Sequence, residues 1–170
     1  MIFLGIGSNL YSSFGDRFDN INLAVSLLKK NSIKIIKKSS FYETFAFPNK
    51  KDPKFINIVI SVKTNLPPLD LISVLILIEE QLERKRKKKN DPRTCDIDII
   101  DYNNEILKIK YRDLNLEIPH KKLNYRNFVL FPLNEICPNW RHPKTGETIN
   151  TLIERLTEDD RKSILKIKKS

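Results

Sequence analysis

The chain has 170 residues, enough to bury a hydrophobic core, and we expect a single domain over residues 1–170. A hydrophobic fraction of 40% and an aromatic fraction of 9% exclude a disordered protein, and the longest apolar run, residues 71–78, is too short to cross a membrane. The net charge of +10 indicates attraction to anions, although scattered lysines contribute much of it.

The first half of the chain predicts strands and helices in alternation, because the spacing of its apolar residues switches between two and about 3.6 residues. Proline and asparagine separate these patterns and indicate loops. The expected elements are a buried strand at 2–4 running into a tight turn at 5–9, a helix at 16–30, long strands at 33–44 and 55–64, and a loop at 45–54.

The second half begins with Pro67 and Pro68, which suit the first turn of a helix. The buried stripe of this helix is expected to be Leu71, Leu75, Ile78 and Leu82. Further elements follow a run of six cations at 84–89. They are a strand around Asp96, a hairpin return at 105–109, a short helix or strand at 125–133, an irregular segment at 138–146, a small helix at 152–156, and a basic tail at 161–170 with a frayed end.

The element order is therefore β-α-β-β-α-β with additions. This order is typical of an α+β, ferredoxin-like fold, in which helices pack on a mainly antiparallel sheet, here with a C-terminal extension. Cys95 and Cys137 are far apart, and no histidine stands at zinc-ligand spacing, so we expect two reduced, buried thiols. No leader-like segment opens the sequence, and we expect a cytoplasmic protein.

The most informative stretch is residues 91–101, DPRTCDIDIID. Its alternation predicts a strand that carries Asp96 and Asp98 on one face, about 7 Å apart. The strand itself offers these carboxylates no cation, and Mg²⁺ is the usual way to hold such a pair ionised. With the cations at 84–89 just upstream, the pattern indicates phosphoryl chemistry on a nucleotide. The alternative is that both aspartates face solvent beside a solvated basic loop.

Other motifs are less specific. Gly5 and Gly7 follow a strand, but Leu10 stands where a dinucleotide-binding motif needs its third glycine, and no P-loop occurs. Phosphates would therefore be held by side-chain cations and metal. His120 lies six residues before Arg126 and could contact a phosphate, whereas His142 is assigned only a structural role. No arrangement for nucleophilic catalysis is apparent.

Asn57 stands in an otherwise apolar strand pattern, between Ile56 and Ile58. A buried amide needs hydrogen-bond partners, and a heterocycle with a donor-acceptor edge would supply them. The alternative is an asparagine on a solvent-facing edge.

Seven segments taken together resemble the 6-hydroxymethyl-7,8-dihydropterin pyrophosphokinase family of folate biosynthesis. They occur in the family's order and at nearly its spacing, from residue 4 to residue 138, and the Pro-Arg-Thr-x-Asp-x-Asp block is the most specific of them. The segments are GIGSNL at 5–10, SFYET at 40–44, FIN at 55–57, Ile78 and Glu79 with Arg84 and Arg86, PRTCDID at 92–98, IPH at 118–120 and RNFVLFPLNEI at 126–136.

The resemblance implies that pyrophosphate passes from ATP to the hydroxymethyl group of the pterin, with release of AMP. It implies two Mg²⁺ ions held by Asp96 and Asp98, and a monomer with ATP and hydroxymethyl-dihydropterin as partners and without nucleic-acid or membrane partners. The implied catalytic residues are Arg86, Arg93, Asp96 and Asp98. The implied pterin contacts are Thr44, Phe45, Phe47, Phe55, Asn57 and Phe128. The implied nucleotide contacts are Glu79, Arg86, Arg93, Ile99, His120 and Arg126.

The resemblance is weakest just before Pro92, where Asn90 and Asp91 replace an aromatic-glycine pair of the family and the loop after Arg86 is one residue shorter. A family arginine of this loop falls on Lys88 or Lys89. Two alternatives follow from these features. One is a nucleic-acid-binding module, argued from the cations at 84–89 and the net charge. The other is a relative that keeps the fold as a binding or structural protein.

Overall fold

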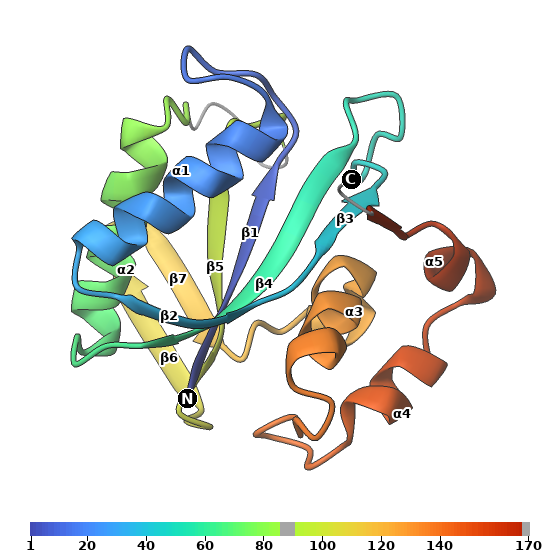
Figure 1. Ribbon diagram of the computed structural model, residues 1–170. Coiled ribbons are helices and arrows are strands. Elements are labelled where there is room, and N and C mark those ends of the chain that lie inside the picture. Colours follow the sequence, from blue (N-terminus) through green and yellow to red (C-terminus); the bar gives the residue numbers. More distant parts are fainter. Residues whose placement is uncertain (86–90, 168–170) are drawn as a thin grey trace.

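The computed structural model of the chain describes residues 1–85 and 91–167, and Figure 1 shows a main sheet with helices on both faces. In these ranges no helix is long and apolar enough to traverse a bilayer. Arg86, Lys88, Lys89 and Asn90 lie outside the described residues. The strands are β1 (Ile2–Ser8), β2 (Lys34–Lys38), β3 (Phe41–Thr44), β4 (Phe55–Lys63), β5 (Asp96–Tyr102), β6 (Leu107–Tyr111), β7 (Leu114–Ile118) and β8 (Leu165–Ile167). The helices are α1 (Arg17–Lys30), α2 (Pro68–Gln81), α3 (Asn127–Ile136), α4 (Ile149–Glu154) and α5 (Glu158–Lys162).

The main sheet of the described ranges has six strands, ordered β5-β1-β4-β3-β8, with β3 and β2 paired to opposite ends of β4. Every pairing in it is antiparallel. The predicted class, a mainly antiparallel sheet with packed helices, is confirmed, and the chain order is compatible with the ferredoxin-like arrangement. The remaining strands, β6 and β7, form a separate two-stranded ribbon.

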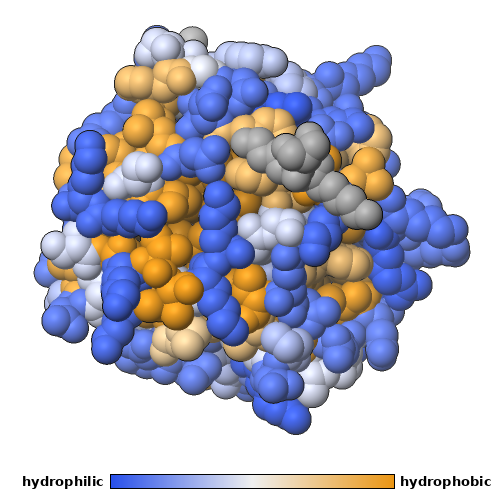
Figure 2. Space-filling model, in the orientation of Figure 1, coloured by the Kyte–Doolittle hydropathy of each residue, from blue (hydrophilic) through white to orange (hydrophobic). Residues whose placement is uncertain are grey.

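Each face of the sheet has its own hydrophobic core, because side chains alternate along a strand. Leu4 and Ile58 pack with α1 and α2 on one face, whereas Phe3 and Val59 pack with α3 and α4 on the other. Figure 1 shows these two helical layers on opposite sides of the strands. On the face shown in Figure 2, apolar residues appear in gaps between hydrophilic ones, so this face is not one continuous apolar surface.

The prediction of a tight turn at 5–9 is wrong for residues 5–8, because β1 continues to Ser8. Gly5 and Gly7 lie inside this strand, where side chains from neighbouring strands leave little room for a Cβ atom. A Cβ atom on Gly7 would lie 2.9 Å from Asn57 Oδ1, and one on Gly5 would lie 3.3 Å from Ile100 Cδ1. The two glycines therefore allow the neighbouring strands to approach closely, and they do not form a turn.

Two other predictions in the sheet are corrected. The long strand at 33–44 is divided into β2 and β3 at Ser39. The Ser39 backbone amide donates to the Val59 carbonyl at 2.9 Å, but its side-chain hydroxyl accepts the Val59 amide at 3.0 Å, so the regular strand pairing is interrupted. The segment 105–109 does not return along β5; β6 pairs with β7 instead. The ribbon is held over α2, where the Tyr111 hydroxyl lies 3.0 Å from Ser73 Oγ.

The C-terminal part is more ordered than its composition suggests. The segment at 125–133 is largely helical, as α3, and the small helix α4 begins at Ile149 because Thr148 caps it. The basic tail is structured as far as Ile167, where β8 pairs with β3; residues 168–170 are outside the described part. Cys95 and Cys137 are free thiols; the expected burial is confirmed for Cys95 but is wrong for Cys137, which is partly exposed.

Candidate active site

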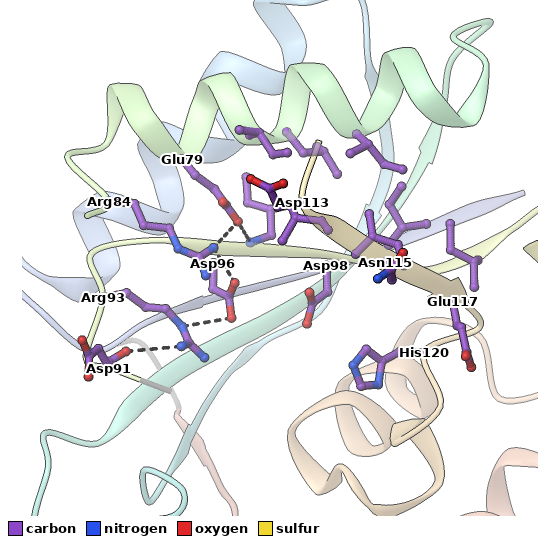
Figure 3. A pocket seen from close by; sticks show the side chains of 18 of the residues that line it. Glu79, Arg84, Asp91, Arg93, Asp96, Asp98, Asp113, Asn115, Glu117 and His120 are labelled. Carbon is purple, nitrogen blue, oxygen red and sulfur yellow. Dashed lines mark hydrogen bonds and ion pairs between the residues drawn. The ribbon is translucent and has the colours of Figure 1, made fainter. Parts of the chain in front are cut away.

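A pocket of about 590 Å³ lies between α2, the first half of β5, the β6–β7 ribbon and the segment before α3. One part of its wall is apolar and comes from α2 and β7, including Leu75 and Leu116. The other part is charged and comes from β5 and its flanking segments. Figure 3 shows the carboxylates of Asp96 and Asp98 pointing to the same side of β5. An apolar wall next to a charged one suits a ligand with a planar base and an anionic tail.

The two carboxylates are paired with arginines from outside the strand. Asp96 Oδ1 lies 2.6 Å from Arg84 Nη1, and Asp96 Oδ2 lies 3.0 Å from Arg93 Nε. Asp98 Oδ2 lies 2.9 Å from Arg126 Nη1. Figure 3 shows Asp96 between Arg84 and Arg93. Asp96 and Asp98 are therefore ion-paired rather than free carboxylates, although 43% of the Asp98 side chain is exposed, and residues 86–89 of the basic run lie outside the described part of the chain.

The two aspartates differ in pKa because they differ in partners. Burial raises the pKa of Asp98, and the negative charge of Asp96 raises it further, against the partial opposition of Arg126. Burial also favours neutral Asp96, but the guanidinium groups of Arg93 and Arg84 outweigh it and hold the Asp96 pKa below its usual value. A cation placed between the two carboxylates would favour the ionised form of both.

Glu79 and Arg84 form a buried pair behind Asp96. The Glu79 side chain is almost fully buried and accepts a hydrogen bond of 2.7 Å from the Ile97 amide. It also forms an ion pair with Arg84. Glu79 thus lines the pocket as expected of a nucleotide contact, but its carboxylate also fixes β5 and Arg84. The bridging role of Arg84 was not assigned from the sequence, because it depends on α2 lying against β5.

His120 and Arg126 lie at the end of the pocket near Asp98. His120 Nδ1 lies 3.0 Å from the Lys122 amide nitrogen, and its Nε2 lies 3.2 Å from Arg126 Nη2. Burial and the charge of Arg126 lower the His120 pKa to about 4. A neutral imidazole has one acceptor nitrogen, so the ring accepts from either the Lys122 amide or Arg126, and its other nitrogen carries the proton. With the ring neutral, Arg126 supplies the positive charge beside Asp98, which suits an anionic oxygen.

The residues expected to bind the pterin lie beside the carboxylates. Asn57 is buried, with Nδ2 3.0 Å from Thr44 Oγ1, so it is not an amide on a solvent-facing edge. The Phe55 ring lies 5.2 Å from the guanidinium carbon of Arg93, and the Phe128 ring lies 5.5 Å from that of Arg126. Each ring therefore contacts an arginine that itself forms an ion pair with Asp96 or Asp98.

The remaining expected contacts are on the edges of this region. Phe45 and Phe47 are in the loop after β3 and are exposed, Phe47 by 76%. Lys54 Nζ lies 4.8 Å from the centre of the Phe45 ring. Ile99 lines the pocket, while Arg86 lies outside the described residues.

Asn9 is a site-building residue that sequence reasoning did not single out. Its Oδ1 accepts the Arg93 amide at 2.7 Å, and its Nδ2 donates to the Pro53 carbonyl at 2.9 Å. It is 2% exposed and joins the end of β1 to the segments before β4 and β5. The signal that could have found it is a polar residue placed directly after a buried strand.

Comparison with known proteins gives a family match. The model of the family described as 7,8-dihydro-6-hydroxymethylpterin-pyrophosphokinase (HPPK) matches residues 3–138. The 2-amino-4-hydroxy-6-hydroxymethyldihydropteridine pyrophosphokinase of Synechocystis is 36% identical over 154 residues, which are 90% of this chain and 74% of that protein. The enzyme of the same name from Aquifex aeolicus is 37% identical over 142 residues, which are 84% of this chain and 83% of that protein.

Some relatives are much longer. The folic acid synthesis protein fol1 of Pneumocystis carinii is 35% identical over 164 residues, and the chain spans 21% of its length. Among solved structures, a Plasmodium falciparum HPPK-DHPS has a TM-score of 0.72 at 16% identity, covering 97% of this chain and 46% of that one. This structural likeness supports the fold.

Proposed function

The chain belongs to the 7,8-dihydro-6-hydroxymethylpterin-pyrophosphokinase family, and we propose how its own residues perform the family's reaction. The reaction transfers pyrophosphate from ATP to the hydroxymethyl group of 6-hydroxymethyl-7,8-dihydropterin and releases AMP. The observation that carries the proposal is the pair Asp96 and Asp98 in a pocket with three arginines.

The nucleotide takes the pocket beside α2. Its base lies against the apolar wall, where Ile99 is one of the lining residues, and its phosphates reach the charged wall. Arg93, Arg126 and neutral His120 supply N–H donors to phosphate oxygens, while Glu79 holds the charged wall in place. Arg86 is added to these phosphate-binding residues from the family resemblance alone, since it lies outside the described residues.

The pterin takes the adjoining surface of β3 and β4. Asn57 reads the polar edge of the heterocycle with Thr44 beside it, and Phe55 and Phe128 offer their rings for stacking. Phe45 and Phe47 close the site from the neighbouring loop. By the resemblance to the family, we propose that the chain acts as a monomer.

A kinase that uses ATP implies Mg²⁺, and the donor set here fits it. In the described part of the chain no group of three or more acidic, histidine or cysteine side chains could hold a metal by itself. Two carboxylates that share their metal with substrate phosphates and water are a usual Mg²⁺ arrangement. We therefore assign Asp96 and Asp98 to two Mg²⁺ ions. When bound, Mg²⁺ neutralises phosphate charge and makes the attacking hydroxyl more acidic.

The protein's own contribution is position and charge. The pterin hydroxymethyl oxygen attacks the β-phosphorus of ATP, the bond from that phosphorus to the α-phosphate oxygen breaks, and AMP leaves. Arg93 and Arg126 stabilise the charge that develops on the phosphate oxygens, and the walls hold the two substrates in line. This explains why the sequence shows no nucleophile and why no strong protein base is required.

The test is AMP release from Mg-ATP, with and without hydroxymethyl-dihydropterin. We expect turnover that needs both the pterin and Mg²⁺ and that Asp96→Ala or Asp98→Ala abolishes. Asp159→Ala, at an exposed position in α5, is the control and should keep full activity. No AMP above background at saturating substrates would refute the enzyme and leave the binding or structural alternatives.

A further inference from the structure

The backbone that leads into Phe55 is not flanked by a strand on both sides. Phe55 is the first residue of β4 and pairs with Thr44 of β3. On the other side β1 ends at Ser8, which pairs with Ile56, so β1 does not extend alongside Phe55. Contacts from outside the sheet must therefore fix the start of this strand, where the ring assigned to the pterin is attached.

Two side chains hold the backbone just before β4. Arg17 Nη1 donates to the Lys54 carbonyl at 2.7 Å, and Asn9 Nδ2 donates to the Pro53 carbonyl at 2.9 Å. Arg17 Nη1 also lies 3.6 Å from Glu43 Oε2, and Lys54 Nζ lies 3.1 Å from Glu43 Oε1. Arg17 thus joins the backbone before β4 to the neighbouring strand β3.

Arg17 reaches this backbone from the face of the sheet opposite to the Phe55 ring. Along β4, Ile56 belongs to the core on the α1 side and Val59 to the core on the α3 side. Because side chains alternate along a strand, Phe55 faces the same side as Val59. Arg17, in contrast, is the first residue of α1. It therefore acts on Phe55 through the backbone and does not touch the substrate.

The helix that begins at Arg17 does not need the guanidinium group. Asp16 caps α1 by accepting the Phe18 and Asp19 amides, and the Asp19 side chain accepts the Asp16 amide in return. A cation in the first turn also lies at the positive end of the helix dipole, which is unfavourable. The local structure thus gives no reason for an arginine at this position, whereas the bond to the Lys54 carbonyl does.

We propose that Arg17 is a positioning residue for the pterin: by holding the Lys54 carbonyl, it fixes the Phe55 ring where it stacks on the heterocycle. This inference rests on the proposed function, since Phe55 is assigned to the pterin there. The hydrogen bond is charge-assisted, and its loss allows the first residue of β4 to shift. A shift of about 1 Å in a group that orients a substrate can cost as much as about 100-fold in rate.

The test is steady-state kinetics of AMP release by the full chain, with KM measured separately for each substrate. Arg17→Met should raise KM for hydroxymethyl-dihydropterin about tenfold and change kcat and KM for ATP by less than about threefold. The unchanged KM for ATP also reports that the variant is folded. Arg17→Lys can still donate one hydrogen bond to the carbonyl and should recover part of the loss.

Arg161→Met is the matched control. Arg161 Nη1 also donates to a backbone carbonyl at 2.7 Å, that of Glu154, but from an exposed position in α5. Its replacement removes the same charge and the same kind of bond far from the assigned pterin residues in sequence. It should change neither KM.

A double-mutant cycle tests whether Arg17 acts through the Phe55 ring. In a Phe55→Leu background, Arg17→Met should raise KM for the pterin by less than about twofold, because the ring that it positions is absent. Binding is measured separately by the fluorescence of the pterin, with Mg²⁺ and an ATP analogue that has a methylene group between the α- and β-phosphorus and cannot react. In this titration Arg17→Met should raise Kd for the pterin about tenfold.

The outcomes separate this inference from the proposed function. An equal KM for the pterin in the wild type and Arg17→Met, an equal rise in KM for ATP, or an equal rise in Arg161→Met would overturn the inference. So would full additivity of Arg17→Met with Phe55→Leu. A wild type that releases no AMP, but whose affinity for the pterin falls as expected in Arg17→Met, would instead overturn the proposed function alone.

Discussion

At the N-terminal end of β5, Asp96 and Asp98 line a pocket and pair with arginines, whereas at its C-terminal end Asp101 is fully buried. Asp101 accepts hydrogen bonds of 2.8 Å from Trp140 Nε1 and of 2.8 Å from the Asn104 amide. The same residue type on one strand therefore serves a binding site at one end and the attachment of the C-terminal part at the other.

A break in the strand register explains how Asp101 reaches its partners. Leu4 pairs with Ile99 but Phe3 pairs with Asp101, so Ile100 is an extra residue in β5. Such a bulge redirects the side chains that follow it. Ile100 and Trp140 both belong to the core on the α3 side of the sheet, whereas Ile99 belongs to the other core. The bulge thus directs Asp101 toward the α3 side, where Trp140 meets it.

The partners decide the ionisation of each carboxylate. Burial raises the pKa of Asp101, and its hydrogen bonds from neutral donors lower it only in part. At Asp96, guanidinium groups overcome the effect of burial and lower the pKa. A buried aspartate with neutral donors is a structural group, while one with cations in a pocket is prepared for charged ligands.

The largest expected effect is a difference in enzymatic activity between variants at the two ends of β5. Asp98→Asn should reduce AMP release at least about 1000-fold, because it removes a carboxylate that we assign to Mg²⁺ and phosphate charge. Asp101→Asn should change kcat/KM per folded molecule by less than about threefold, since it touches no substrate. Steady-state kinetics on protein checked by circular dichroism makes the comparison. Equal losses in the two variants would contradict the division of roles.

The second expected effect is on stability, and it concerns Asp101 at the structural end of β5. In Asp101→Asn an NH₂ group replaces one of the two acceptor oxygens, so either Trp140 Nε1 or the Asn104 amide loses its acceptor. The free energy of unfolding should fall by about 1–3 kcal/mol. Trp140→Phe should cost a similar amount, and the double variant should cost less than the sum. Urea denaturation of the four proteins measures this, and full additivity would mean that the Trp140 bond does not matter.

The third effect concerns the strand beside the functional end. Gly7 pairs with Asp96 on one side and with Asn57 on the other. Gly7→Ala places a Cβ 2.9 Å from Asn57 Oδ1, so Asn57 must move, and KM for the pterin should rise about tenfold with KM for ATP unchanged. Gly146→Ala is the control: its φ of +73° makes alanine strained, but the added Cβ meets no atom within 4 Å. It should lower stability without changing either KM.

The smallest effect concerns the charge of His120. Its pKa of about 4 in the folded chain lies below the unfolded value of about 6.5, so the ring is neutral between pH 6 and 8. His120→Gln, which is also neutral, should change KM for ATP by less than about threefold, and the wild-type KM should show no inflection near pH 6.5. An inflection there that His120→Gln abolishes would mean that a charged ring binds the phosphates.

The same shift has a consequence for stability. Between pH 6.5 and about 4 the unfolded chain binds a proton at His120 more readily than the folded chain does. Stability from this group is therefore lost as the pH falls through that window. His120→Gln should lose less stability than the wild type over the same range, as measured by thermal unfolding.

The arrangement of elements was largely predictable, because it depends on local patterns. Alternation along β4 and helical spacing in α2 are visible over single segments, and Pro67 and Pro68 mark where α2 begins. The predictions that failed depend on neighbours distant in sequence. Gly5 and Gly7 indicate a turn unless the side chains of other strands that lie against them are known. Likewise, no local pattern in the basic tail indicates that its residues 165–167 pair with β3 as β8.

The sequence by itself determined that Asp96 and Asp98 share one side of a strand, since a period of two residues requires it, and its motifs indicated the family. Only the tertiary structure decided which cations meet these carboxylates. Arg84, Arg93 and Arg126 come from three separate segments, and no local pattern predicts which of them reaches which oxygen. The structure likewise decided that Asp101, three residues after Asp98, has a different role, because a single extra residue in β5 turns it toward Trp140.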